Sequence, residues 1–291
     1  MKLVRFGPPG AERPGIWLQP EGDAGDAAIL DVRASVFDIA DYDAHFFATN
    51  GLARLEALLQ EERHTLVPSA GTRLGPPVAR PGKIMCLGAN YARHAAEFGH
   101  EVPREPMVFA KAPTAVTGPF DPIELPPDAQ AVDSEVELGV VIGCTARAVS
   151  VNDALACVAG YTVVNDVTDR VTQRATGQWF RGKGCDTFCP MGPFLVTPDE
   201  IENPQDLRLY SAVNEDLLQD GHTGDMIFSI AQIIETLSAT ITLEPGDLIA
   251  TGTPAGVGSA QEPPRFLEPG DTIEIGVQGL GAQISPVVRR T

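Results

Sequence analysis

The sequence predicts an α+β fold that is mainly β. Many short apolar segments of strand length follow residue 83, and turns rich in Pro and Gly separate them. Few segments show the apolar spacing of a helix. Strands and helices do not alternate regularly along the chain, so a doubly wound parallel sheet is not expected.

The first 70 residues are expected to form a small N-terminal domain. They contain two short apolar segments, and one segment whose leucines repeat at helical spacing. The expected strands are residues 1–6 and 14–18, and the expected helix is residues 51–62. Residues 71–83 are rich in Pro and Gly and predict a linker or an extended crossing segment. A second, larger domain would follow over residues 84–291.

The larger domain is expected to contain most of the strands. Its apolar segments predict strands at residues 84–88, 135–142, 161–165, 194–197, 207–213, 247–251 and 272–277. Other segments predict helices at residues 90–98, 151–158 and 229–239. In the last of these, Ile230, Ile233 and Leu237 share one face, as in an amphipathic helix.

Charge and composition exclude several classes of partner. The chain of 291 residues has a net charge of −18, so nucleic acids and anionic membranes, which attract basic surfaces, are not expected as partners. No stretch reaches the roughly 18 apolar residues of a membrane span, and no secretion signal is recognised. The 5 cysteines are too scattered for a disulfide framework. These features together predict a cytoplasmic protein.

Two glutamates one residue apart suggest a metal site. Glu135 and Glu137 begin an apolar segment, and alternate residues of a strand point to the same face. Two carboxylates this close repel each other unless a positive charge lies between them, and a hard divalent cation would fit. Asp166, which follows the apolar segment Y-T-V-V-N, could be a third ligand. The alternatives are a solvated strand face for the two glutamates and a helix cap for Asp166.

Two further features could supply a base and a cation. His94 and Glu97 are three residues apart on an expected helix, close enough for a hydrogen bond that orients the imidazole as a general base. Lys183 lies between Gly182 and Gly184, which would let a substrate approach the backbone closely. The alternatives are an ordinary surface pair and a solvated turn lysine. The sequence has neither a phosphate-binding loop nor a nucleophile elbow.

Several motifs, in order along the chain, resemble those of one enzyme family. They are G-A-N-Y-A-R-H-A-A-E, D-S-E-V-E-L-G-V-V-I-G, V-A-G-Y-T-V-V-N-D-V, G-Q-W-F-R-G-K, D-T-F-C-P-M-G-P, M-I-F-S, L-E-P-G-D and T-G-T-P-A-G-V-G. From about Lys83 to the C-terminus, the chain resembles the fumarylacetoacetate hydrolase superfamily. The resemblance implies that residues 84–291 form a catalytic domain built on a mixed β-roll, usually in a homodimer. It also implies Mg²⁺ or Mn²⁺ held by Glu135, Glu137 and Asp166.

The resemblance also assigns roles to the other candidate residues. It implies that His94 and Glu97 activate a water molecule, often on a mobile lid. It implies that Lys183 contacts the substrate and supports developing negative charge. Substrate contacts are implied for Arg170, Gln173 and Thr253.

The implied activity is metal-dependent hydrolysis of a C–C bond in an acylpyruvate-type 2,4-diketo acid, with a pyruvate enolate as leaving group. The substrate would be a small anionic keto acid. The G-K-G-C-D-T-F segment resembles a branch that includes hydrolases of sugar-derived 2,4-diketo acids. Decarboxylation of oxaloacetate and isomerisation of a hydroxymuconate-like diacid would use the same enolate and are alternatives. A binding module without catalysis is an alternative of another class.

Overall fold

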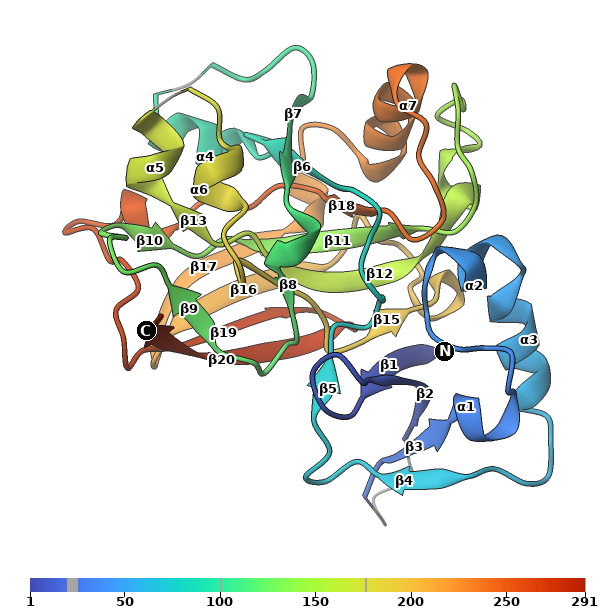
Figure 1. Cartoon of the computed structure of the whole chain (residues 1–291). Helices are drawn as coiled ribbons and strands as arrows, with labels where there is room; N and C mark the ends of the chain where they lie inside the picture. The colour runs from blue at the N-terminus through green and yellow to red at the C-terminus, as the bar shows by residue number, and fades with distance from the viewer. Residues whose placement is uncertain (20–25, 100, 176, 291) are drawn as a thin grey trace.

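The computed structural model describes residues 1–19, 26–99, 101–175 and 177–290 (Figure 1). One sheet of 11 strands dominates the described chain. Its path is β4 (Leu66–Pro68), β3 (Ala28–Asp31), β2 (Arg13–Leu18), β1 (Lys2–Phe6), β15 (Leu195–Val196), β12 (Val158–Asn165), β11 (Val136–Ile142), β18 (Leu248–Ala250), β6 (Ile84–Gly88) and β7 (Met107–Lys111), with β5 (Leu74–Gly75) paired to β1.

A second sheet packs against the middle of the first. Its order is β17 (Asp216–His222), β16 (Arg208–Val213), β19 (Thr272–Val277), β20 (Gly281–Arg289) and β9 (Ile123–Leu125). Two short ladders complete the strands, β10 (Val132–Asp133) with β13 (Thr168–Asp169), and β14 (Cys189–Pro190) with β8 (Val116–Thr117). The prediction of a mainly β, α+β fold is confirmed.

The helices are short and lie around the sheets (Figure 1). They are α1 (Val32–Ser35), α2 (Ala44–Ala48), α3 (Gly51–Leu58), α4 (Ala92–Glu97), α5 (Arg170–Ala175), α6 (Phe180–Lys183) and α7 (Ile230–Thr240). Single 3-10 turns occur at Pro113–Ala115, Ala154–Cys157, Pro198–Glu200, Thr223–Asp225 and Gly258–Ala260. No described helix has both the length and the apolar character to cross a membrane.

The N-terminal strands continue the sheet of the rest of the chain. β1 pairs antiparallel with β15, with Lys2 opposite Val196 and Leu3 opposite Leu195. Within the expected linker, β5 pairs with β1, which places Gly75 opposite Arg5. The expected strands and helix of residues 1–70 are found, although α3 ends at Leu58. The division into a small domain, a linker and a larger domain stays a prediction.

The two central strands carry the site at one end. β11 and β12 pair antiparallel with Val136 opposite Asn165, and all residues of both strands are buried. On one face of β11, Leu138 and Val140 join the core formed with the second sheet and α7. Glu137 alternates with these residues and therefore points to the opposite face. Strand alternation thus separates the apolar core from the acidic group.

One expected helix is wrong. Residues 151–158 form a turn followed by the 3-10 turn Ala154–Cys157, because Val158 already belongs to β12 and pairs with Ile142 of β11. The other two expected helices of the larger domain are present as α4 and α7. In α7, Ser229 and Gln232 form a capping box that fixes its first turn. The structure adds α5 and α6, which the sequence pattern did not predict.

Candidate active site and metal centre

Three buried carboxylates meet at the ends of β11 and β12. Glu135 immediately precedes β11, Glu137 lies within it, and Asp166 immediately follows β12. One oxygen from each residue lies within 4.8 Å of the others. The Asp166 backbone N–H donates to the Glu135 carbonyl at 2.9 Å, which extends the ladder to the acidic residues. A solvated strand face and a helix cap are therefore both wrong for these residues.

Two buried lysines face the carboxylates. Lys183, the last residue of α6, donates to Asp166 Oδ2 at 2.5 Å and to Glu135 Oε2 at 2.7 Å. Lys111, the last residue of β7, donates to Asp166 Oδ1 at 2.6 Å. Burial alone would lower the pKa of Lys183, but Asp166 and Glu135 outweigh it and raise the pKa, so this lysine stays protonated. The interpretation of Lys183 as a solvated turn lysine is wrong.

Glu137 is the carboxylate of the cluster for which the described residues provide no ion pair. Its Oε2 accepts a hydrogen bond from the Gly252 backbone N–H at 2.8 Å. Burial, followed by the negative charges of Asp166 and Glu135, raises the pKa of Glu137 well above its usual value. The cluster therefore holds one more carboxylate than its two lysines neutralise.

A divalent cation fits this donor set. Mg²⁺ and Mn²⁺ prefer carboxylate oxygens at about 2.0–2.2 Å, so ligand atoms on opposite sides of such an ion lie about 4.2 Å apart. The oxygens of Glu135, Glu137 and Asp166 approach one another on this scale. A cation would also offset the negative charge that raises the pKa of Glu137.

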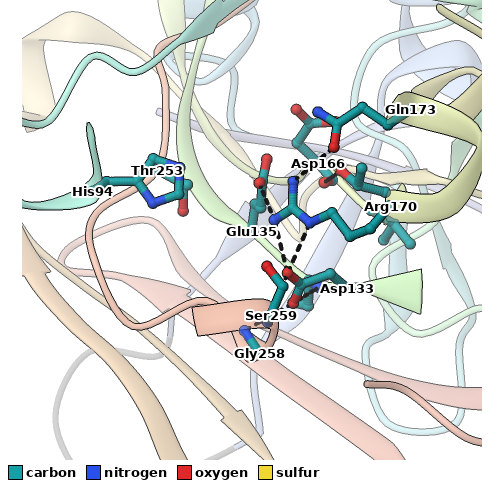
Figure 2. Close-up of polar contacts among 12 residues, drawn as sticks. His94, Asp133, Glu135, Asp166, Arg170, Gln173, Thr253, Gly258 and Ser259 are labelled. Carbon is teal, nitrogen blue, oxygen red and sulfur yellow. Dashed lines mark hydrogen bonds and ion pairs between the residues drawn. The ribbon is translucent and has the colours of Figure 1, made fainter. Parts of the chain in front are cut away.

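Arg170 clamps the outer side of Glu135 (Figure 2). Its Nη2 donates to Glu135 Oε1 at 2.6 Å and to Asp133 Oδ2 at 2.7 Å, and its Nε donates to Asp133 Oδ2 at 2.9 Å. Its Nη1 donates to Gln173 Oε1 at 3.3 Å. Burial alone would raise the pKa of Glu135, but Arg170 and Lys183 outweigh it and lower that pKa. Glu135 is thus held as an anion beside Glu137, whose ionisation is disfavoured.

Asp133 connects this clamp to the glycine-rich loop that follows β18. Its Oδ1 accepts from the Gly258 backbone N–H at 2.8 Å, and its Oδ2 accepts from the Ser259 N–H at 3.1 Å (Figure 2). Buried charges in proteins are normally paired and hydrogen-bonded, and Asp133 meets both conditions. The loop is thereby fixed relative to Arg170.

Thr253 lies on the same loop and is bonded to β11. Its Oγ1 donates to the Val136 carbonyl at 2.8 Å and accepts from Gln219 Nε2 at 2.7 Å. Gln219 Oε1 in turn accepts from the Val136 N–H at 3.1 Å. The Thr253 hydroxyl hydrogen is therefore engaged within the protein, although the residue lines the cavity described below.

The expected imidazole–carboxylate pair is formed on α4. His94 Nδ1 lies 3.1 Å from Glu97 Oε2, and Glu97 Oε1 accepts from the Gly256 backbone N–H at 2.7 Å. The Asn90 side chain, just before α4, donates to the Thr251 carbonyl at 2.7 Å. His94 is buried. The surface-pair interpretation is therefore wrong, because this pair is built into the wall of a cavity.

A cavity of about 510 Å³ brings most of the predicted residues together. This volume is in the range of small-molecule sites. Of the predicted residues it is lined by Glu135, Glu137, His94, Lys183, Arg170, Gln173 and Thr253. Glu97 reaches the cavity through His94, and Asp166 is joined to the cavity wall through its ion pair with Lys183. The apolar part of the wall consists of Leu87, Ala89, Ala95, Phe98, Met107, Phe109 and Trp179.

Sequence reasoning missed Lys111, Gln219 and the structural role of Asp133. The sequence contains a signal for Lys111, because it ends the apolar segment M-V-F-A-K, and a lysine in an apolar strand is rarely buried unless it is paired. The sequence contains no such signal for Gln219, because its hydrogen bond to Thr253 joins residues that are 34 positions apart.

Comparison with known proteins identifies the family. Residues 83–288 match the model of the fumarylacetoacetate (FAA) hydrolase C-terminal family. A protein of Burkholderia multivorans that carries only a general hydrolase name is 47% identical over 287 residues, which cover 98% of each chain.

Solved structures agree over the whole chain. A fumarylacetoacetate hydrolase from Exiguobacterium antarcticum is 35% identical with a TM-score of 0.83, and a maleylpyruvate hydrolase from Sphingobium is 33% identical with a TM-score of 0.80. A 5-carboxymethyl-2-hydroxymuconate delta-isomerase from Mycobacterium smegmatis is 36% identical with a TM-score of 0.77. Each alignment covers 100% of both chains. The family match, the fold and the carboxylate site lead to one conclusion: the chain belongs to the fumarylacetoacetate hydrolase family.

Proposed function

We propose that this protein is a metal-dependent hydrolase that cleaves a C–C bond in an acylpyruvate-type 2,4-diketo acid. One observation carries the proposal: His94, which is bonded to Glu97, lines the same cavity as Glu135 and Glu137 of the buried carboxylate cluster. Such a hydrolysis requires a cation site for the acid end of the substrate and a base for the water that attacks its other end.

The metal would be Mg²⁺ or Mn²⁺, with Glu135, Glu137 and Asp166 as its ligands. When bound, it would supply positive charge to the carboxylate and keto oxygens at the acid end of the substrate. This charge would let a protein of net charge −18 accept an anionic substrate.

His94 would remove a proton from the attacking water. Glu97 would accept a hydrogen bond from His94 Nδ1, which leaves Nε2 of His94 as the basic nitrogen. The Glu97 carboxylate also favours the imidazolium that forms when His94 takes up a proton. The Gly256 N–H holds Glu97 in place. The activated water would add to the carbonyl farther from the acid end.

Lys183 would stabilise the negative charge of the departing pyruvate enolate. It is fully buried and remains protonated, so its charge acts in a medium that screens it weakly. Gln173 and Thr253 would contact the bound substrate from the cavity wall. Arg170 would act mainly by holding Glu135, since its guanidinium is already bonded to two carboxylates.

Isomerisation of a hydroxymuconate-type diacid is the second candidate. Structures named as isomerases of such compounds are 36% identical to this chain. An isomerase moves a proton on carbon and consumes no water, so the His94 base could serve either reaction.

Turnover of defined substrates tests the proposal. Purified protein is offered several 2,4-diketo acids and a hydroxymuconate-type diacid with Mg²⁺ or Mn²⁺, and both absorbance and pyruvate release are followed. We expect pyruvate release from a diketo acid, and loss of that activity after chelation. Isomerisation without pyruvate release would favour the second candidate, and turnover of neither compound class would overturn the proposal.

We also propose a cytoplasmic homodimer. The edge strand β7 leaves Met107 and Val108 each 41% exposed, and α6 leaves Phe180 51% exposed. Exposed apolar side chains on an unpaired strand edge favour association with a second copy. Light scattering of the eluting protein should give twice the mass of 30.9 kDa.

A further inference from the structure

Arg174 lines the cavity, and its positive charge has no ion-pair partner among the described residues. It lies on α5, lines the cavity and is exposed to solvent. Neither a hydrogen bond nor an ion pair within the described chain involves its guanidinium. The other two cations of the cavity wall differ, because Arg170 is bonded to Asp133 and Glu135, and Lys183 is bonded to Glu135 and Asp166.

The two inner cations are also covered by aromatic rings. The Phe98 ring lies 6.0 Å from the Arg170 guanidinium carbon, and the Phe109 ring lies 4.8 Å from Lys183 Nζ. Trp179 packs edge-on against Phe109 at 5.2 Å. The inner cations therefore lie between carboxylates and aromatic surfaces, and their charge is already shared with the carboxylates of the cluster.

Arg174 is displaced from the carboxylate cluster along the helix. It follows Arg170 by four residues, which places both on one side of α5, about 6 Å apart along the helix axis. Arg170 is buried and Arg174 is exposed, so this displacement leads from the cluster toward solvent. The cavity thus has a carboxylate-rich inner end, an apolar wall and a cation at its outer part.

We infer that Arg174 selects substrates that carry a second carboxylate at the acyl end. This inference rests on the proposed function. A 2,4-diketo acid whose keto-acid end faces Glu135 and Glu137 would direct its acyl chain along the apolar wall. A terminal carboxylate on that chain would otherwise face Phe98, Met107 and Trp179, where desolvation is costly. The Arg174 fork can bind it through two parallel hydrogen bonds.

The reaction remains a balanced hydrolysis. For the seven-carbon diacid 2,4-dioxoheptanedioate, water adds at C4, the C3–C4 bond breaks, and its electron pair leaves with the pyruvate enolate. The enolate takes up a proton to give pyruvate, and the acyl fragment becomes succinate. The matched monoacid, 2,4-dioxoheptanoate, gives pyruvate and butanoate by the same steps. Only the terminal carboxylate differs between the two substrates.

The preference for the diacid measures the role of Arg174. We expect wild-type kcat/KM to favour 2,4-dioxoheptanedioate over the monoacid by roughly tenfold, as for one charge-assisted contact at a partly solvated site. Arg174→Gln should remove this preference by lowering kcat/KM for the diacid alone, and Arg174→Lys should restore part of it. The preference should also decline as salt is raised, because the guanidinium is exposed.

Arg181→Gln is the matched control, because Arg181 is an exposed arginine on the neighbouring helix α6 and does not line the cavity. An unchanged diacid preference in Arg174→Gln, or an equal loss in Arg181→Gln, would overturn the inference. So would a wild-type enzyme that prefers the monoacid. If the wild type hydrolyses neither substrate, the result counts against the proposed function and not against the role of Arg174. The two outcomes can therefore be distinguished.

Discussion

At the residue scale, Asp166 links the carboxylate cluster to both buried lysines. Its Oδ1 accepts from Lys111 and its Oδ2 from Lys183. Asp166→Ala should abolish metal-dependent turnover, because it removes a proposed ligand and leaves two buried ammonium groups facing fewer carboxylates. Isothermal titration with Mn²⁺ checks the binding directly. Undiminished Mn²⁺ affinity in this variant would show that the metal ligands are other residues.

Lys183→Met should affect both catalysis and stability. We expect kcat to fall about 10²–10³-fold, as for the loss of one preorganised electrostatic donor. Lys183 is buried and paired with Glu135 and Asp166, so its loss leaves each of these buried carboxylates with one cationic partner fewer, and Tm should fall by several degrees. Steady-state kinetics and calorimetry report the two effects separately. An unchanged kcat in Lys183→Met would show that Lys183 has a structural role only.

His94→Ala and Glu97→Gln separate hydrolysis from other uses of the site. Loss of a general base should lower diketo-acid hydrolysis about 10²–10⁴-fold in His94→Ala, and Glu97→Gln should have a smaller effect because the base remains but is less well oriented. Any decarboxylation of oxaloacetate needs no attacking water and should be much less affected. Both substrates are assayed on the wild type and both variants at saturating metal. Wild-type hydrolysis in His94→Ala would place water activation elsewhere.

At the element scale, the His94–Glu97 pair lies on the short helix α4. The helix spans 6 residues, and its functional face is joined to the following loop through the Glu97–Gly256 bond and through Asn90. Isolated helices of this length are unstable, so substrate contacts should add to its order. We expect hydrogen exchange of the segment 90–99 to slow when oxalate, a mimic of the enolate, is added with Mg²⁺. The 11-residue helix α7 serves as an internal control. Unchanged exchange in 90–99 would contradict the lid interpretation.

At the scale of the whole molecule, metal binding should stabilise the fold. The proposed ligands lie in or next to the two central strands β11 and β12, so an ion would join the two strands that carry much of the core. A ligand at about 100 times its Kd adds about 2.7 kcal/mol of stability, which corresponds to several degrees in Tm for a chain of this size. Calorimetry of chelated protein with and without added Mn²⁺ measures this shift, and Asp166→Ala should show none. An equal shift in that variant would assign the effect to another site.

The sequence determined the fold class, most of the strands and most of the residues that meet at the cavity. Apolar residues at alternate positions of β11 pack into the core, and the same alternation predicts that Glu135 and Glu137 point together. The three-residue spacing of His94 and Glu97 is local, so their contact could be anticipated from helix geometry alone. The family motifs then supplied the proposed roles that spacing could not assign.

Only the tertiary structure decided how these groups are charged and which of them are free. The pairing of Lys111 with Asp166 spans 55 residues, and the clamp of Arg170 on Asp133 spans 37, distances over which no local pattern specifies a partner. The misplaced helix at 151–158 has the same cause, since pairing of Val158 with Ile142 overrides local helical spacing. Local periodicity specifies which face a residue occupies, whereas burial and long-range pairing decide its charge state and its availability to a substrate. That is why Arg170 could be named from the sequence, while the unpaired charge of Arg174 became visible only in the folded chain.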